Sequence, residues 1–301
     1  MTNDAHSYRF TGGSVGFLLI HGLGGTPMEL RFVAQGLARN GHTVVCPQLA
    51  GHCGTADDLR ATGWKDWYAS VEKAHAELIK ECDVVIVGGL SMGAMLALHL
   101  AANHPDDVHG TALFAPTLWL DGWGVPWYGA LFKLVLHKWV ADLVPFSERE
   151  PFGIKDARVR DLVLGALQSG DSSRAGMLST PGSSMLELRW LVREVRRELS
   201  GIRQPALIIH PREDDRSDVK NAMYLSRNLG GIVDLVVLDD SYHIITLDRQ
   251  RHVVVDRSHT FATWVDKQVS ERRSTAAAVR AAGARYAPTS ATGREAAVHR
   301  G

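Results

Sequence analysis

The 301-residue chain contains little cysteine, no excess of either charge and no long apolar run. Its three cysteines, Cys46, Cys53 and Cys82, lack C-x-x-C spacing. This argues against a disulfide scaffold or a thiolate zinc site, and it favours a reducing compartment such as the cytoplasm. Lysine and arginine together number 33, as do aspartate and glutamate. The basic excess typical of nucleic-acid binders is therefore missing, and we expect no nucleic-acid partner.

Two further absences concern membranes. No run of about 18 apolar residues is present, so we expect no stable membrane insertion. Residues 1–9 are polar and lack the apolar segment of a signal peptide. A hydrophobic fraction of 45% with 22% charged residues is instead typical of a globular protein. The composition leaves the oligomeric state open.

Short apolar runs with few charges alternate with helix-like segments. Because the runs are continuous rather than alternating, they indicate strands buried on both faces. The expected strands are Gly16–His21, Thr43–Pro47, Val84–Gly88, Thr111–Phe114, Ala206–His210 and Asp234–Leu238. Helical periodicity appears in Glu29–Asn40, Trp64–Ile79 and Met92–Asn103. This order predicts an α/β fold with a mainly parallel sheet flanked by helices.

One interval is too long for a simple crossover. About 90 residues separate Phe114 from Ala206, and they hold five of the eight tryptophans. We interpret residues 117–200 as a helical cap inserted over a core formed by 1–116 and 201–269. Apolar side chains of the cap, with Trp127 and Trp139 as candidates, would then line a substrate pocket. The alternative is a helical elaboration remote from any site.

The last residues, 270–301, are rich in alanine, arginine, serine, threonine and glycine and almost without large apolar side chains. Such a composition has nothing to bury, so we expect a disordered tail.

The strongest chemical signal is Gly89-Leu90-Ser91-Met92-Gly93, a G-x-S-x-G pattern. A second match centres on Ser14, but that serine precedes the first expected strand and no helix follows it. Ser91 lies between an expected strand and an expected helix, the setting of a nucleophile elbow. The glycines are needed there because side chains would collide with the neighbouring strand and helix.

The loop His21-Gly22-Leu23-Gly24-Gly25 directly follows the first expected strand. Its backbone can turn an N–H toward the serine and, with the N–H of Met92, form an oxyanion hole. Gly22 would then contact the substrate, and His21 would support the loop. A plain tight turn is the alternative interpretation.

A serine nucleophile needs a base and an acid. His243 is the best candidate for the base because it follows a strand late in the chain. The acid is expected after the strand Ala206–His210, where Asp214 and Asp215 are both plausible. Spacing alone cannot choose between them. Asp239 and Asp240 are alternatives, although they lie so near His243 that they are expected to shape its loop.

These residues together resemble the α/β-hydrolase superfamily, and within it the small bacterial carboxylesterases and monoacylglycerol lipases. The matching segments are LLIHGLGGTP, PQLAGH, GWKDWYASV, VGGLSMG, PALIIHPREDD and SYHIITLD. The resemblance implies an α/β-hydrolase fold with a cap between the sixth and seventh core strands. It places the acid at Asp214 and the oxyanion amides at Leu23 and Met92. Cys53 and Pro211 depart from the family pattern, in which glycine or alanine is usual.

We therefore expect a serine hydrolase of carboxylic esters with a Ser91–His243–Asp214 triad and an apolar acyl or aryl substrate. No metal or organic cofactor is required. A thioesterase, an amidase or a polyester hydrolase could use the same triad. The alternative outside the enzymes is a non-catalytic, hydrolase-like binding protein.

Overall fold

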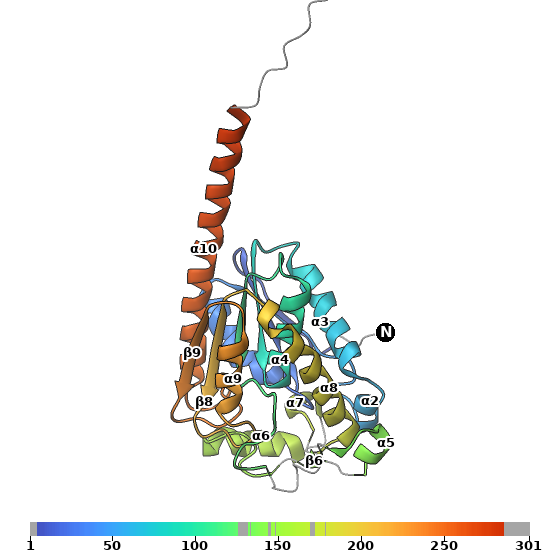
Figure 1. The fold of residues 1–301 in the computed structure, drawn as a ribbon. Coiled ribbons are helices and arrows are strands. Elements are labelled where there is room, and N and C mark those ends of the chain that lie inside the picture. The colour runs from blue at the N-terminus through green and yellow to red at the C-terminus, as the bar shows by residue number, and fades with distance from the viewer. Residues whose placement is uncertain are drawn as a thin grey trace, which may run out of the picture.

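A seven-stranded sheet runs through the middle of the molecule (Figure 1). The computed structural model describes residues 5–125, 132, 134–143, 146–147, 149–168, 172–177 and 179–285. In spatial order the strands are β1 (Tyr8–Phe10), β3 (Thr43–Cys46), β2 (Val15–Ile20), β4 (Val84–Leu90), β5 (Gly110–Phe114), β8 (Ala206–Pro211) and β9 (Val233–Leu238). All neighbours pair in parallel except β1 with β3. The expectation of a mainly parallel sheet is confirmed.

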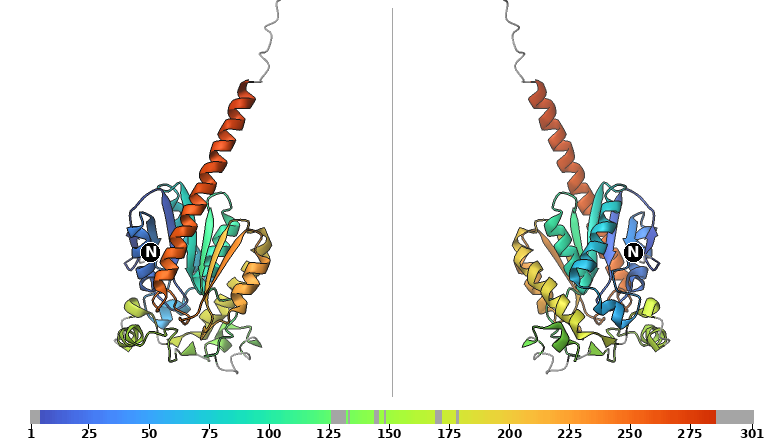
Figure 2. Two further views of the ribbon diagram at one scale, coloured as in Figure 1. Left: turned by 90° about the vertical axis from the view of Figure 1, so that its left-hand side faces the viewer. Right: turned by 90° about the vertical axis from the view of Figure 1, so that its right-hand side faces the viewer.

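Helices cover both faces of this sheet (Figure 2). Helices α1 (Arg31–Arg39) and α10 (Arg251–Arg285) lie on one face. The other face carries α3 (Trp64–Leu78), α4 (Met92–Asn103), α8 (Gly182–Glu198) and α9 (Lys220–Asn228). Along β2, Phe17 and Leu19 pack toward the first layer, whereas Leu18 and Ile20 pack toward the second. This double burial explains why the strand sequences are continuously apolar.

Two local features differ from expectation near the N-terminus. Strand β1 was not predicted, because three residues are too few to show a period. The helix expected to begin at Glu29 starts instead as a 3-10 turn, η1 (Pro27–Leu30), which precedes α1. Thr26 caps this turn by accepting the Met28 N–H, and the fixed φ of Pro27 suits its first position.

The insertion lies at the carboxyl edge of the sheet, at the lower end in Figure 1. Among the sheet strands in chain order, it follows the fifth rather than the sixth, between β5 and β8. Besides α8, its described elements are α5 (Lys138–Ala141), α6 (Ala157–Gln168), α7 (Ser172–Ala175) and the antiparallel pair β6 (Phe146–Ser147) and β7 (Ser179–Thr180). Smaller elements elsewhere are α2 (Ala56–Arg60) and η3 (Leu199–Gly201).

Helix α8 does not belong to the cap alone. Its side chains Leu186, Leu191 and Val195 are fully buried and share one apolar cluster with α4. The C-terminal part of the 117–200 segment is thus a layer of the core. The boundary between cap and core that the sequence placed at residue 200 therefore does not coincide with the packing, because α8 packs on the core.

The tail differs from the expected disorder over part of its length. Helix α10 continues to Arg285 and leaves the body of the protein (Figure 2). Its first half is anchored by buried Val254, Phe261 and Ala262, and the alanine-rich second half has high helix propensity. Residues 286–301 lie outside the described residues. Despite its length, α10 is not apolar enough to cross a membrane, and neither is any other helix in the described part of the chain.

Candidate active site

Ser91 occupies a sharp turn between β4 and α4, with φ 56° and ψ −112°. A positive φ is unfavourable for a residue with a side chain, so the surrounding structure must hold this conformation. A Cβ atom at either Gly89 or Gly93 would collide with the carbonyl oxygen of Ile20. The glycines of the motif are therefore required by close packing. Ser14, in contrast, is exposed in a bend before β2.

The imidazole of His243 pairs with the Asp214 carboxylate. Nδ1 lies 3.0 and 2.9 Å from the two carboxylate oxygens, and both side chains are buried. Asp214 Oδ1 also accepts the N–H groups of Arg216 and Ser217 at 2.8 and 2.9 Å. These contacts hold the imidazole so that Nδ1 donates and Nε2 stays available for proton transfer.

The electrostatics keep this acid ionised. Burial alone would raise the pKa of the Asp214 carboxyl, but the His243 charge and hydrogen bond outweigh it. His210 and the Ser217 N–H act in the same direction, so the pKa of Asp214 lies below its usual range. Buried His210 has a lowered pKa, chiefly through desolvation, and its Nε2 contacts the Ser217 carbonyl at 2.8 Å.

Asp215 has a different task from its neighbour. Its carboxylate accepts the backbone N–H groups of His243, at 3.3 Å, and of Gly153 in the insertion, at 3.1 Å. It is buried and supports the histidine loop from the backbone side. Asp239 and Asp240 point elsewhere, since they pair with Arg212 and with Lys155 and Arg249. Only Asp214, of these four candidates, reaches the His243 ring in the described structure.

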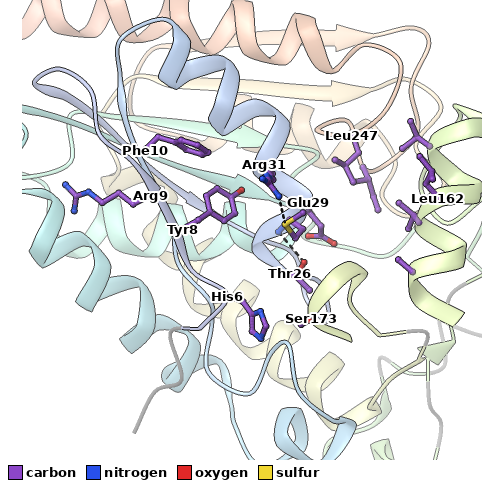
Figure 3. A pocket seen from close by; sticks show the side chains of 15 residues that line it. His6, Tyr8, Arg9, Phe10, Thr26, Glu29, Arg31, Leu162, Ser173 and Leu247 are labelled. Carbon is purple, nitrogen blue, oxygen red and sulfur yellow. Dashed lines mark hydrogen bonds between the residues drawn. The ribbon is translucent and has the colours of Figure 1, made fainter. Parts of the chain in front are cut away.

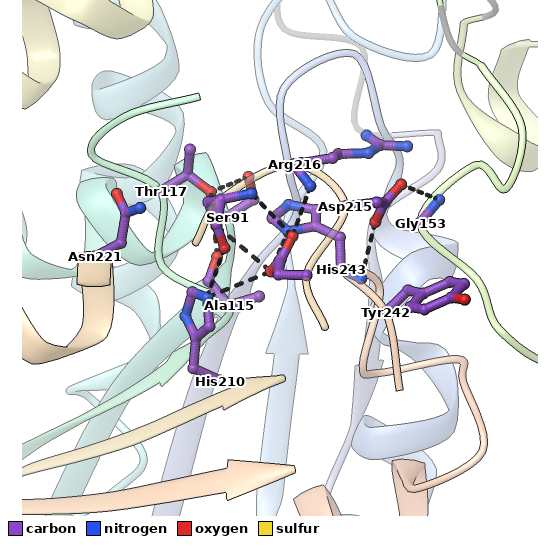
Figure 4. A network of polar contacts seen from close by, with 12 residues as sticks. Ser91, Ala115, Thr117, Gly153, His210, Asp215, Arg216, Asn221, Tyr242 and His243 are labelled. Atoms are coloured by element: carbon purple, nitrogen blue, oxygen red, sulfur yellow. Dashed lines mark hydrogen bonds and ion pairs between the residues drawn. The ribbon is translucent and has the colours of Figure 1, made fainter. Parts of the chain in front are cut away.

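The Ser91 hydroxyl is hydrogen-bonded to Thr117, with 3.1 Å between the two oxygens (Figure 4). Thr117 Oγ1 also lies 3.2 Å from Ser217 Oγ, which is 3.4 Å from Asp214 Oδ2. A chain of hydroxyls thus links Ser91 to Asp214 without passing through His243. Sequence reasoning missed Thr117, although its place three residues after β5 puts it at the same sheet edge as Ser91.

The loop after β2, residues 21–25, is the expected oxyanion loop, and it makes a tight turn beside the cavity that Ser91 lines. A turn is closed by the bond from Gly25 N to Gly22 O at 3.2 Å, and Gly24 has φ +69°. Such a turn leaves the N–H of its second residue, Leu23, outside its own hydrogen bond. Met92 is the first residue of α4, where N–H groups have no intrahelical acceptor. Leu23 and Ser91 line the same cavity.

Two side chains brace this loop. His21 Nδ1 lies 2.9 Å from Gly22 O, while its Nε2 accepts the Leu49 N–H at 3.3 Å. Since Nε2 accepts, the proton resides on Nδ1, and burial holds the pKa of His21 well below its ordinary value. Glu29 accepts the Gly22 N–H at 3.0 Å. The support by His21 was expected, whereas Glu29 was not recognised from the sequence.

The insertion also touches the oxyanion loop. The Met177 N–H donates to Gly24 O at 3.0 Å. Gly176 has φ +89°, and a Cβ atom there would approach Gly24 O to 2.5 Å. The backbone at 176–177 therefore fits closely against the loop that follows β2.

Asp248 anchors the loop that carries His243. Its buried carboxylate accepts four backbone N–H groups at 2.7–2.9 Å. Two come from the insertion, Lys155 and Asp156, and two from the histidine loop, Tyr242 and Arg249.

A cavity of about 520 Å³ opens over Ser91, His243, Gly22 and Leu23. Its walls are largely apolar and include Leu118, Trp119, Phe132, Phe146, Met185 and Leu188. This size falls within the usual range for small-molecule sites. The expectation that apolar side chains of the 117–200 insertion line the pocket agrees with these walls, although the sequence singled out Trp127 and Trp139 rather than these six residues.

Neither of the two tryptophans that were expected in this pocket is among its described lining residues. Trp139 does not line the cavity and is 70% exposed, so that expectation was wrong. Periodicity over a four-residue helix, α5, could not distinguish its inner from its outer face. Trp127 lies outside the described residues. Within the described part of the chain, no group of three or more His, Cys, Asp or Glu side chains is arranged to hold a metal ion.

Comparison with known proteins identifies the family of this chain. Residues 17–257 match the family model described as the alpha/beta hydrolase family. The chain belongs to this family. Two relatives of this α/β hydrolase are a thermostable monoacylglycerol lipase from Bacillus sp. (strain H-257) and a carboxylesterase from Bacillus subtilis (strain 168). The first is 30% identical, covering 86% of this chain and 94% of the relative. The second is 23% identical, covering 86% and 96%.

A solved structure described with LipS and LipT, two metagenome-derived lipolytic enzymes, is similar to this α/β hydrolase over most of its length. The TM-score is 0.69 at 26% sequence identity, with 87% of this chain and 98% of the other covered. The resemblance recognised in the sequence is thus confirmed at the level of family and fold.

Proposed function

We propose that this α/β hydrolase cleaves carboxylic esters through a covalent acyl-serine intermediate. The observation that carries the proposal is the convergence of Ser91, on its strained turn, and the buried His243–Asp214 pair at one apolar cavity. The names of the relatives, a monoacylglycerol lipase and a carboxylesterase, support the same class of reaction.

In the first step the Ser91 oxygen leaves Thr117, gives its proton to His243 Nε2 and attacks the ester carbonyl. The carbonyl π electrons move onto oxygen, and the N–H groups of Leu23 and Met92 stabilise the resulting oxyanion. Asp214 stays ionised and stabilises the imidazolium. Collapse of the intermediate breaks the bond to the leaving alcohol, which takes the proton from His243.

In the second step water attacks the acyl-serine carbonyl while His243 accepts its proton. The second tetrahedral intermediate collapses, releases the carboxylic acid and returns the proton to Ser91. The residues that act are the chain's own, and no cofactor enters either step.

The substrate we propose is a small-molecule ester with an apolar acyl or aryl group. The largely apolar walls of the cavity favour such a group, because each methylene removed from water contributes about 0.8 kcal/mol. Thioesters, amides and polyesters remain candidates, because the same triad can cleave them. We place the enzyme in the cytoplasm, since Cys46 and Cys82 are buried as thiols and thiols persist in a reducing compartment.

Labelling with a fluorophosphonate and assay on p-nitrophenyl esters, thioesters and anilides test this proposal. Ser91→Ala should abolish labelling and lower kcat by about 10⁴–10⁶, because it removes the nucleophile. Ser14→Ala is the matched control, since that exposed serine fits the same motif but should leave activity unchanged. A protein that neither labels nor turns over any of these substrates would be the non-catalytic binding protein instead.

A further inference from the structure

A second cavity lies beside the catalytic pocket, between the N-terminal edge of the sheet and the insertion (Figure 3). We call it the β1–α6 groove. Its volume is about 710 Å³, within the range of small-molecule sites. The side chains that line it are mostly apolar and include Tyr8, Phe10, Met28, Leu162, Val163 and Leu247.

Two residues, Glu29 and Ile244, line both this groove and the catalytic cavity. Glu29 accepts the Gly22 N–H, and Ile244 directly follows His243. The two cavities therefore share one wall residue that contacts the oxyanion loop and one that adjoins His243. A ligand in the groove would occupy a separate volume that adjoins the catalytic machinery.

The groove also presents a cation at its rim. Arg31 is exposed, and in the described structure its guanidinium donates to the Met28 thioether across 3.9 Å. Sulfur is a weak acceptor, so this contact satisfies little of the guanidinium's capacity. Arg9, also at the groove, is instead engaged by Glu81. Of the two arginines at the groove, Arg31 is thus the better placed to meet an anionic ligand.

One wall residue is unusually exposed for its type. Leu162, on α6, is 76% exposed, although it faces a groove lined by other apolar side chains. An alkyl chain lying in the groove would cover it and gain free energy from the apolar area removed from water. A ligand with an apolar chain and an anionic end therefore matches both the apolar walls of the groove and Arg31 at its rim.

We propose that the β1–α6 groove binds an aliphatic carboxylate, with its chain along Leu162 and Val163 and its carboxylate at Arg31. The choice of ligand rests on the proposed function, because hydrolysis of an apolar ester releases such an acid. The groove is then a second site for the reaction product, adjoining the site that forms it.

The experiment first blocks Ser91 with a long-chain alkyl fluorophosphonate, so that an alkyl chain fills the catalytic pocket. Titration calorimetry with dodecanoate then reports on the groove, and one equivalent should bind. Leu162→Glu should weaken this binding about tenfold, since it removes an apolar contact and adds a like charge. Leu143→Glu is the matched control, because that leucine is 73% exposed in the same insertion but outside the groove, and it should change nothing.

A second pair of measurements tests the head group. Arg31→Gln should weaken dodecanoate binding about threefold, the scale of an exposed ion pair, and leave dodecanol binding unchanged. The proposal is overturned if blocked enzyme binds no dodecanoate, if both glutamate variants weaken it equally, or if Arg31→Gln leaves dodecanoate binding unaltered.

Failure of the proposed function would show separately, as failure of Ser91 to label. The titration would then use unlabelled protein, in which dodecanoate should bind at two sites and Leu162→Glu should weaken one of them about tenfold. Two affinities that are both unaffected by that variant would overturn the groove proposal as well.

Discussion

Asp214 and Asp215 are neighbours in sequence, yet one contacts the His243 ring and the other its backbone. Asp214→Asn should lower kcat about 10⁴-fold, because an amide cannot hold the imidazole in the required tautomer. Asp215→Asn should lower kcat much less but destabilise the fold by about 1–3 kcal/mol, the cost of a buried N–H left without an acceptor. Steady-state kinetics and urea unfolding of both variants check this ranking.

Asp215 is only 5% exposed, so its hydrogen bonds to the His243 and Gly153 N–H groups are shielded from water. If Asp215→Asn lowered kcat more than Asp214→Asn and left the free energy of unfolding unchanged, Asp215 rather than Asp214 would be the acid of the triad.

In the described structure the Ser91 hydroxyl is hydrogen-bonded to Thr117, and under the proposed mechanism this bond must break before Ser91 gives its proton to His243. Thr117→Val keeps the shape of the side chain but removes this hydrogen bond, whose net contribution is about 1 kcal/mol. We expect the second-order rate of fluorophosphonate labelling to rise about fivefold, since a tenfold change corresponds to about 1.4 kcal/mol.

Thr117→Ser restores the hydroxyl and should return the labelling rate to that of the unmodified protein. A slower rate in Thr117→Val would mean that the bond holds Ser91 in its reactive position.

At the scale of elements, the insertion and the oxyanion loop meet at Gly176. Gly176→Ala should push the Gly24 carbonyl and turn the Leu23 N–H from its direction, because the new Cβ would approach Gly24 O to 2.5 Å. We expect kcat to fall about tenfold or more with KM little changed, a partial loss of oxyanion stabilisation. Gly165→Ala, on α6 with nothing within 4 Å of its Cβ position, should leave kcat intact. Equal losses in both variants would argue against coupling through this contact.

Some secondary-structure elements have a recognisable sequence pattern and others do not. Strands β2, β4, β5 and β8 were recognised within two residues because burial on both faces imposes continuous apolar runs. Strand β1 is too short for a pattern. The extension of α10 beyond residue 270 was missed, because the expectation of disorder rested on the lack of apolar residues to bury. A helix that is already anchored at its N-terminal half can continue through residues of high helix propensity without further burial.

The site shows the same division. Ser91 and His243 were recognised because a turn motif and strand ends carry local signals. The choice of Asp214 depended on family resemblance, since one residue of spacing does not determine which side chain points inward. Thr117 and Glu29 act through contacts made in space, 26 residues from Ser91 and seven from Gly22. No local pattern marks such contacts.

At the scale of the whole molecule, buried neutral histidines predict acid sensitivity. Burial lowers the pKa of His52 to about 4, although its Nδ1 contacts Ala50 O at 3.0 Å. Between pH 6.5 and 4 the unfolded chain binds a proton there that the folded protein does not, so the free energy of unfolding must fall as the pH falls. At pH 4.5 this group should account for about 2–3 kcal/mol of the loss relative to pH 7.

His52→Gln should reduce that loss by the same amount, as measured by urea unfolding at the two pH values. His252→Gln provides the control, because that side chain is exposed on α10 and meets water in both states. An identical pH dependence in the parent protein and His52→Gln would contradict the assignment.

The four N–H groups held by Asp248 have a consequence for how the enzyme could open. They join residues 155–156 of the insertion to the loop that carries His243 through one buried carboxylate. This part of the insertion must therefore travel with the base, and any hinge for substrate entry must lie elsewhere along the insertion. Hydrogen exchange would test whether the two segments open together. The amide protons of Lys155, Asp156 and Tyr242 should then exchange at the same rate, through a single opening event.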